Sequence, residues 1–363
     1  MSLPSMNVIF KSAAITAIRQ SARGTVGLIL KDTVPATNPI VMAAPGEVPT
    51  TLTAANQAAI KLAFLGNVYA PRKVVAYILG TPGTGETILD LYGEALQYFA
   101  LNRVNYIASP TADTDSACST IVTWVQAQRA GTNKVKAVLP NTTANDEGVI
   151  NYAINANVSG ATTYTAEAYT PRIAGLLAGT PSDQGATFAA LPDLDSCTFM
   201  TKTELETAIS AGKFVIFNDG EKIKVARAVN SLTTISAGKS TAWQKIKVIE
   251  TMDMISEDLT LLVEDTYIGK YPNTYANKGL VLSAVGTYLA EIAAQGLVEN
   301  VVVDLDAAKI KDYIITYKGV PVEEANAMDE TELKKQYTDE KVFLVATMTV
   351  VDVMEDITLN ITV

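Results

Sequence analysis

Alternating runs of apolar and polar residues divide the chain into short strands and helices. Apolar runs bounded by turn residues predict strands over 25–30, 73–79, 104–108, 135–139 and 214–217. Apolar positions three and four residues apart predict helices over 54–65, 88–101, 115–129, 171–178 and 203–211. From residue 88 the strands and helices alternate, which is typical of a mainly parallel sheet covered by helices on both faces.

The last third of the chain has its own pattern. A predicted helix over 278–294 ends at Gly296, a strand over 298–303 follows, and Asp306 begins another helix. Residues 323–340 are charged and are expected to be exposed. Two strands, 342–350 and 357–363, end the sequence, and the second alternates apolar and polar side chains throughout.

These patterns suggest four parts. We expect an N-terminal arm at 1–23, a small β-rich module at 24–87, a central α/β domain at 88–245 and a C-terminal α/β domain at 246–363. The arm lacks the periodicity that forms a core, and four prolines between 35 and 49 keep the next segment extended or turning. The predicted fold class is therefore α/β (α+β), with several domains.

Composition narrows the possible functions. The 363 residues suffice for two or three domains of about 150 residues. Because 48% of them are hydrophobic and 18% charged, the chain is not disordered. It contains no histidine, which excludes Ser-His-Asp and Cys-His catalysis and imidazole metal ligands. We expect no catalytic residues, and the protein is not predicted to be an enzyme.

Net charge, hydrophobicity and cysteine content argue against further classes of function. A net charge of −10 without a basic run disfavours binding to nucleic acid or to anionic membranes. The most apolar window, 342–351, is about half as long as a membrane-spanning helix, so membrane insertion is not expected. Cys118 and Cys197 have no metal-binding or redox spacing. We expect reduced thiols, although a disulfide between them remains open.

A glycine-rich loop suggests an alternative function. Gly80–Thr87 follows a strand, precedes a helix and matches a phosphate-binding loop except that Glu86 replaces the lysine. A carboxylate there would repel phosphates, so we expect an ordinary loop and no cofactor. The alternative is a nucleotide-binding α/β enzyme that uses this loop. Gly238-Lys239-Ser240 supplies a lysine, but Thr233 stands where the first glycine should be.

An acidic pair is a candidate metal site, and the end of the chain is a candidate for contact with another subunit. Asp304 and Asp306 end a strand, where carboxylates can hold magnesium, but Asp306 is better placed as a helix cap, so no metal site is expected. The terminal strand 357–363 can pair inside its own domain or be donated to a neighbouring subunit, because a strand with nothing after it leaves an open edge.

Several segments resemble one family. The stretch 164–194, which contains Tyr-Thr-Pro-Arg-Ile-Ala-Gly-Leu-Leu-Ala-Gly-Thr-Pro at 169–181, is similar to the signature of contractile tail sheath proteins from phages and prophages of Gram-positive bacteria. Phe-Asn-Asp-Gly at 217–220 with 225–234, and the segments 245–254 and 268–275, agree with it. The resemblance covers nearly the whole chain, and its central motif is the specific part.

This resemblance implies a structural polymer. Sheath subunits form stacked hexameric rings around an inner tube, and the sheath contracts to drive that tube through a cell envelope. The implied partners are other copies of the chain, the tail tube protein, and baseplate and tail terminator proteins; the implied location is the virion tail, with assembly in the host bacterial cytoplasm. The implied central domain is a three-layer, subtilisin-like α/β domain without catalytic residues. The sheath of a related secretion or bacteriocin machine is a second alternative.

Family arms add strands to a neighbour's sheet, which gives candidate residues here. Either Val26, Leu28 and Leu30, or Ile357, Leu359 and Ile361, are expected to bury their apolar faces in a sheet shared between subunits. Deleting residues 1–20 should leave a folded monomer that forms no long tubes.

Overall fold

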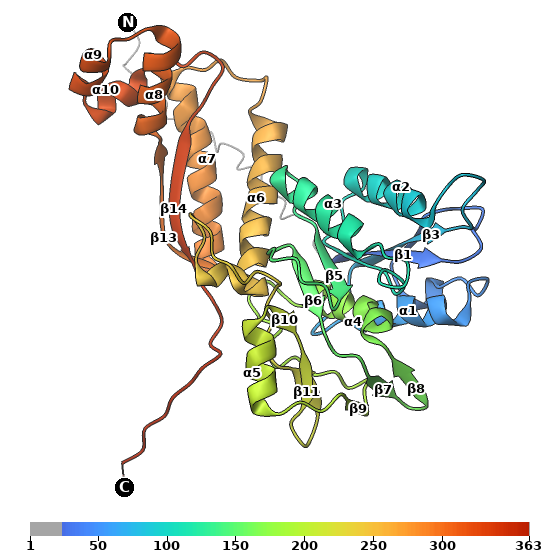
Figure 1. Cartoon of the computed structure of the whole chain (residues 1–363). Coiled ribbons are helices and arrows are strands. Elements are labelled where there is room, and N and C mark those ends of the chain that lie inside the picture. The colour runs from blue at the N-terminus through green and yellow to red at the C-terminus, as the bar shows by residue number, and fades with distance from the viewer. Residues whose placement is uncertain (1–23, 363) are drawn as a thin grey trace, which may run out of the picture.

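The computed structural model describes residues 24–362, so the predicted arm at 1–23 and Val363 lie outside the described residues. Its centre is a seven-stranded sheet in which the five pairings among six neighbouring strands are parallel and the edge strand β2 pairs antiparallel with β3 (Figure 1). In spatial order the strands are β10 (Lys213–Phe214), β6 (Val149–Tyr152), β5 (Lys136–Pro140), β4 (Tyr106–Ala108), β1 (Thr25–Lys31), β3 (Lys73–Leu79) and β2 (Ile40–Met42). The predicted, mainly parallel sheet is confirmed.

Helices cover both faces of this sheet. α1 (Ala54–Phe64) and α4 (Ala166–Ala178) pack on one face, and α2 (Ile88–Leu101) and α3 (Cys118–Ala130) pack on the other (Figure 1). Successive residues of a strand point to opposite faces, so Leu28 of β1 lies in the first core and Ile29 in the second. α1 and α4 approach so closely that a Cβ at Gly175 would lie 1.9 Å from the carbonyl oxygen of Ala63.

The predicted separate module at 24–87 is wrong. Its strands β1, β2 and β3 belong to the same sheet as β4, β5 and β6, and β1 pairs with both β3 and β4. The prolines and glycines around these strands form loops within the domain. Turn residues indicate where a strand ends, whereas the partner of a strand depends on residues far away in the sequence.

Two small sheets and a helix lie beyond the main sheet, in the lower part of Figure 1. β7 (Asn157–Ser159), β8 (Thr162–Tyr164) and β9 (Ser196–Cys197) form one sheet, and β11 (Ile216–Asn218) and β12 (Ile223–Val225) form the other. α5 (Lys202–Ser210) confirms the helix predicted there. The strand predicted over 214–217 is divided between β10 and β11. The helix predicted from Pro171 begins earlier, since Thr165 caps it by accepting a hydrogen bond from the N–H of Ala168.

The last part of the chain forms an elongated unit beside the central sheet (Figure 1). It consists of α6 (Ile246–Thr266), α7 (Tyr275–Ala294), β13 (Val298–Leu305), α8 (Ala307–Lys318), α9 (Val322–Ala327), α10 (Glu330–Lys335) and β14 (Leu344–Val350). Two short 3-10 helices, Pro45–Glu47 and Thr241–Gln244, lie in loops. The charged segment 323–340 contains all but the first residue of α9 and the whole of α10, which pack on α8 through Ala325 and Leu333.

Candidate assembly interface

The glycine-rich loop does not have the geometry of a phosphate site. The side chain of Glu86 accepts a hydrogen bond of 2.8 Å from the backbone N–H of Gly83, so the loop's own carboxylate occupies this amide. Thr87 caps α2 in a reciprocal pair with Asp90, as expected for the start of a helix. Both observations support an ordinary loop.

The acidic and cysteine candidates also have structural partners. Asp306 caps α8 by accepting a hydrogen bond from the N–H of Lys309, and Asp304 forms an ion pair of 2.6 Å with Lys334. Within residues 24–362 there is no group of three or more His, Cys, Asp or Glu side chains that could hold a metal ion. Cys118 and Cys197 are free thiols, and burial raises the pKa of both.

Val26, Leu28 and Leu30 are not available for sharing between subunits, which corrects that prediction. They lie on β1 and are completely buried in the core of their own domain. β1 pairs with β3 along one edge and with β4 along the other. Because both edges are occupied within the chain, a neighbour's strand cannot add to β1.

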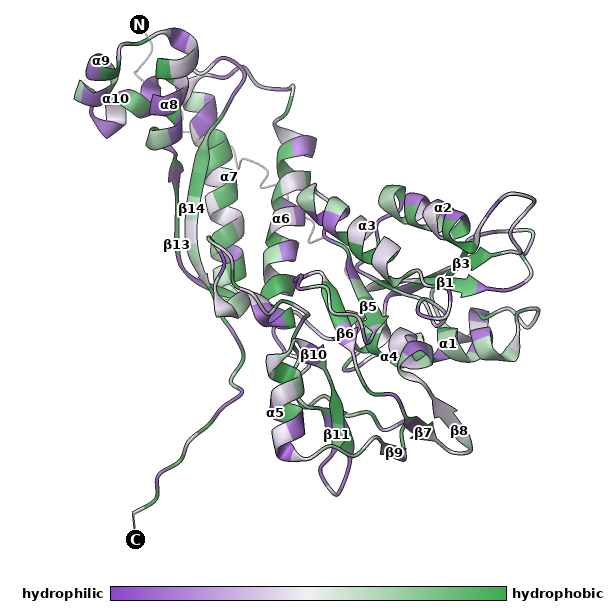
Figure 2. Ribbon diagram, in the orientation of Figure 1, coloured by the Kyte–Doolittle hydropathy of each residue, from purple (hydrophilic) through white to green (hydrophobic). Residues whose placement is uncertain are grey.

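Ile357, Leu359 and Ile361 have the opposite environment. Their exposed fractions are 81%, 77% and 75%, and residues 351–362 belong to no strand. The chain leaves the folded body here as an extended segment in which hydrophobic and polar residues alternate (Figure 2). We call residues 357–363 the tail, of which the structure describes 357–362. Its predicted pairing with another subunit stays a prediction, because a single chain provides no partner.

The residues before the tail are bound to the central domain. We call residues 351–356 the tail anchor. The side chain of Lys245 forms ion pairs with Asp352 and Glu355, and the guanidinium of Arg227 binds both carboxylate oxygens of Asp356 at 2.7 and 2.8 Å. Burial lowers the pKa of Lys245, but the two carboxylates raise it more. The anchor therefore fixes where the tail leaves the molecule.

Additional contacts hold the anchor along its length. The N–H of Val351 donates to the carbonyl of Leu297 at 3.0 Å, and the hydroxyl of Thr187 donates to Glu355 at 2.5 Å. Val353 packs on Gly185, where a Cβ would approach its side chain to 2.8 Å. The sequence analysis did not identify this anchor. The acidic residues Asp352, Glu355 and Asp356, directly before an apolar alternating segment, are the signal it contained.

β13 and β14 form a two-stranded antiparallel sheet, so each has one edge without a partner strand among residues 24–362. The inner face of the sheet packs on α6 and α7 through Leu289, Val298 and their neighbours. The outer face leaves Val302 and Val345 exposed. Unpaired strand edges are templates for pairing with another chain.

A charged cluster joins α6 to the central sheet. Asp253 on α6 accepts hydrogen bonds from Arg129 at 2.8 and 3.0 Å and from Lys136 at 2.9 Å. Lys136 also lies 2.9 Å from Glu250. Burial raises the pKa of Asp253, but the two cations lower it further, so its net pKa is depressed. The cluster positions the C-terminal unit against the sheet.

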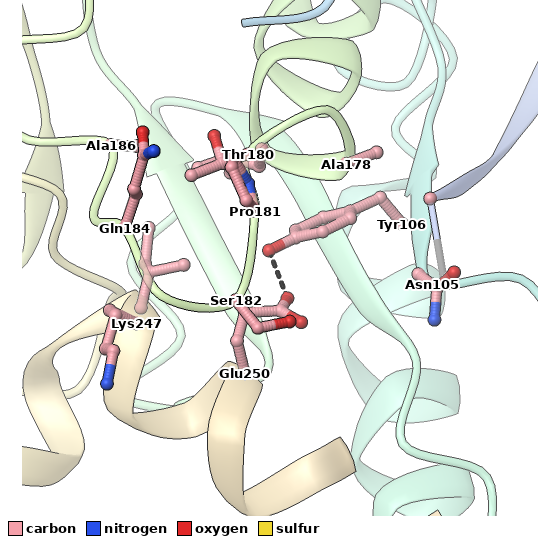
Figure 3. A pocket seen from close by; sticks show the side chains of 13 residues that line it. Asn105, Tyr106, Ala178, Thr180, Pro181, Ser182, Gln184, Ala186, Lys247 and Glu250 are labelled. Atoms are coloured by element: carbon pink, nitrogen blue, oxygen red, sulfur yellow. Dashed lines mark hydrogen bonds between the residues drawn. The ribbon is translucent and has the colours of Figure 1, made fainter. Parts of the chain in front are cut away.

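A small cavity beside this cluster has no enzymatic geometry. Figure 3 shows the hydroxyl of Tyr106 pointing at the carboxylate of Glu250, with Lys247 on the adjacent turn of α6. Its volume of about 40 Å³ is far below the roughly 300 Å³ at which ligand pockets begin. Burial lowers the pKa of Lys247, whose ammonium group donates to the carbonyl of Val351 in the anchor. The cavity is a gap in a domain joint.

Among the described residues, no helix has the length and apolar character needed to cross a membrane.

Comparison with known proteins identifies the family. The phage tail sheath protein central domain matches residues 83–231, and the phage tail sheath C-terminal domain matches residues 238–363. The chain is 35% identical over 366 aligned residues to the tail sheath protein of Clostridium phage phiCD119, covering 99% of both proteins.

Solved structures share the fold. The sheath tail protein of Desulfitobacterium hafniense superposes with a TM-score of 0.70 at 16% identity, covering 96% of this chain and 100% of that one. The helical sheath of the anti-feeding prophage in its contracted state superposes with a TM-score of 0.68 at 16% identity, covering 100% of this chain and 99% of that one. The chain belongs to the phage tail sheath protein family.

Proposed function

We propose that this chain is a structural subunit of a contractile tail sheath, and that its copies are linked by donation of the tail to a neighbour's β13–β14 sheet. The family match supports the sheath role. The observation that carries the linkage is the tail itself, which exposes three large apolar side chains at alternating positions directly after a bound anchor.

Energetics favour a partner for the tail. Burying an exposed Leu or Ile side chain contributes about 1.5–3 kcal/mol. Three such side chains therefore contribute roughly 4.5–9 kcal/mol before the cost of ordering the tail is subtracted. Main-chain hydrogen bonds along the added strand supply register and further stabilisation. A contact in which one copy's tail meets another copy's sheet is heterologous, and such contacts generate rings or helices.

The proposal includes the finer arrangement. Copies stack as hexameric rings around an inner tube, with the tube protein, the baseplate and a tail terminator as partners, and the predicted arm at 1–23 adds a second donated segment. The sheath contracts and drives the tube through a cell envelope. The subunit assembles in the host bacterial cytoplasm, remains in the virion tail and catalyses no reaction.

Truncation tests the linkage. A chain lacking residues 357–363 should fold with an unchanged circular dichroism spectrum and melting temperature, because the large side chains of the tail are exposed and residues 357–362 belong to no strand. It should form no long tubes by negative-stain electron microscopy at concentrations at which the full chain does. Long tubes from the truncated chain would contradict the proposal.

Matched substitutions at constant chain length test whether tube formation depends on the apolar face of the tail. Replacing Ile357, Leu359 and Ile361 together with asparagine should abolish tubes, since the face that would be buried becomes polar. Replacing Thr358, Asn360 and Thr362 together with serine should leave tube formation intact.

A further inference from the structure

We infer that an apolar groove on the C-terminal unit is a carboxylate-binding contact between copies, in which the ammonium group of Lys278 takes an Asp or Glu side chain from residues 24–356 of a second copy. This inference rests on the proposed function, because it assumes that copies assemble. It adds a contact that the tail does not make.

The groove lies where α6 ends, α7 begins and the chain enters β14, at the end of the elongated unit that is farther from the tail (Figure 1). Its volume is about 510 Å³, within the roughly 300–1,000 Å³ of ligand pockets. Ile268 is 63% exposed there and Tyr271 is 51% exposed, and gathered apolar side chains of this kind mark an interaction surface. The apolar and aromatic lining includes Val263, Tyr267, Ile268, Val281, Val342 and Leu344.

Lys278, in the first turn of α7, brings a positive charge to this groove. It is only 3% exposed, and its ammonium group donates to the carbonyl of Gln336 and to the hydroxyl of Thr338, both at 3.0 Å. An ammonium group has three N–H donors, so one of them is left for a further acceptor. Glu340 also lines the groove, but within residues 24–362 neither it nor any other carboxylate forms an ion pair with Lys278.

The other buried cations of the described chain lie near carboxylates. Lys136 and Arg172 each form an ion pair with an aspartate, at 2.9 and 3.0 Å. Burial lowers the pKa of Lys247, and two further aspartates oppose that effect. Burial lowers the pKa of Lys278 as well, but no described carboxylate opposes it. A buried charge without an opposite charge destabilises the fold that contains it, so Lys278 has the environment of a group whose counter-ion comes from outside the chain.

A second polar atom at the groove also lacks a partner. The amide nitrogen of Asn273 donates to the carbonyls of Asp339 and Lys341 at 2.7 and 2.9 Å, whereas its Oδ1 is buried and accepts no hydrogen bond from the described residues. An acidic residue of a polypeptide would satisfy both groups, because its carboxylate accepts from Lys278 and a backbone N–H donates to Asn273. A small anion has no such donor.

The sequence restricts where the carboxylate comes from. Acidic side chains exceed basic ones by ten in the whole chain, so carboxylates without a cationic partner of their own are abundant. Neither the predicted arm at 1–23 nor the tail at 357–363 contains Asp or Glu. The side chain that reaches Lys278 therefore belongs to residues 24–356 of the second copy, and the contact is independent of strand donation.

Carbodiimide cross-linking tests the contact in the unmodified chain. The reagent joins an amine to a carboxylate in contact with it, forming an amide bond with loss of water. Equal amounts of chain labelled with nitrogen-15 and of unlabelled chain are mixed, assembled into tubes, treated, digested and analysed by mass spectrometry. Tubes should give mixed-isotope links from Lys278 to an Asp or Glu within 24–356, at least tenfold more abundant than in unassembled protein at the same concentration.

The outcomes separate this inference from the proposed function. Tubes without an interchain link from Lys278 would overturn the inference and leave the sheath role intact. A link from Lys278 to the terminal carboxylate of Val363 alone would also overturn it, because that carboxylate belongs to the tail. A full chain that forms no tubes would refute the proposed function itself.

A substitution tests whether the charge is needed for assembly. Lys278→Met keeps the apolar stem of the side chain and should lower the yield of sedimentable tubes at least tenfold, whereas Lys61→Met, at an exposed lysine on α1, should leave it unchanged. Unassembled Lys278→Met should melt no lower than the unmodified protein, because the substitution removes an unpaired buried charge. Equal tube yields from the two variants, or a lower melting temperature for Lys278→Met, would assign Lys278 to the fold alone and overturn the inference.

Discussion

Asp253 holds α6 against the central sheet, and its replacement by alanine tests whether ion pairs stabilise this joint. The carboxylate is buried, as is the side chain of Lys136, which is 1% exposed. Removing one partner of a buried ion pair costs about 3–5 kcal/mol, because the remaining charge keeps its desolvation penalty without compensation. Lys136 retains Glu250 at 2.9 Å, so we expect the lower end, about 3 kcal/mol.

Urea unfolding measures this loss. With a slope of about 3 kcal/mol per M, the midpoint of the transition should fall by about 1 M. The matched control is Lys202→Ala, which removes an ion pair of 3.7 Å whose side chains are 89% and 62% exposed. Exposed pairs at this helical spacing contribute about 0.3–0.5 kcal/mol, so the control should barely shift the midpoint. A loss below 1 kcal/mol for Asp253→Ala would refute the reasoning.

The pH dependence has a defined sign. The pKa of Asp253 is lower in the folded protein than its ordinary value of 3.8. A carboxylate with a depressed folded pKa contributes stability that is present above its unfolded pKa and lost as the pH falls through the folded value. The difference in stability between the unmodified protein and Asp253→Ala should thus be constant near neutrality and decrease below about pH 4.

Three further predictions concern packing, the anchor and the loop. Gly175→Ala should lower the free energy of unfolding in urea by about 1–3 kcal/mol, because the new Cβ meets the carbonyl of Ala63. Gly93→Ala, which has open space on helix α2, should raise that free energy by about 1 kcal/mol. A shift of the same sign in both variants would contradict the packing argument. Arg227→Glu should speed hydrogen exchange in residues 351–356, and adding Asp356→Arg should restore protection; unchanged exchange in the single variant would mean that this pair does not hold the anchor. ATP should not raise the melting temperature. If the Gly80–Thr87 loop did bind ATP, a concentration of a hundred times the dissociation constant would add about 2.7 kcal/mol to the free energy of unfolding, so a rise would support the nucleotide-binding alternative.

Local signals in the sequence located most of the central elements. β3 and α2 have the predicted bounds, 73–79 and 88–101, because Gly80 and the cap at Thr87 mark their ends clearly. α6 was not predicted, since Asp253 and Asp258 are buried on it and break the apolar stripe that a helix facing a core normally shows. Partners for these charges come from distant elements, which a local pattern cannot reveal.

The two segments considered for exchange between subunits, 25–30 and 357–363, differ in their pattern of apolar residues. The segment 25–30 has consecutive apolar residues, Leu28, Ile29 and Leu30, which is typical of a parallel strand buried on both faces, and this pattern argued against an exchangeable edge. The tail alternates instead, which is typical of a strand with one buried face. The sequence analysis kept both segments as candidates, and the alternating one is the segment that the structure leaves exposed. The anchor that orients it depends on Arg227 and Lys245, more than a hundred residues earlier.

The two ends of each proposed link lie on different domains, and this has a mechanical consequence. Residues 352–356 of the anchor bind the central domain, whereas the proposed acceptor, the β13–β14 sheet, belongs to the C-terminal unit of the next copy. A change in the relative position of two copies must therefore be taken up where the anchor meets the donated strand. No spacer separates Asp356 from Ile357, and an added strand of seven residues spans only about 23 Å. Asp356 is 84% exposed, so its pair with Arg227 contributes at most about 1 kcal/mol and can exchange. The row of main-chain bonds in the donated strand is stronger in sum. Contraction would therefore exchange the Arg227–Asp356 pair before it unpairs the strand, while Lys245 and Thr187 hold the rest of the anchor, and neighbouring copies would stay linked while their domains rotate.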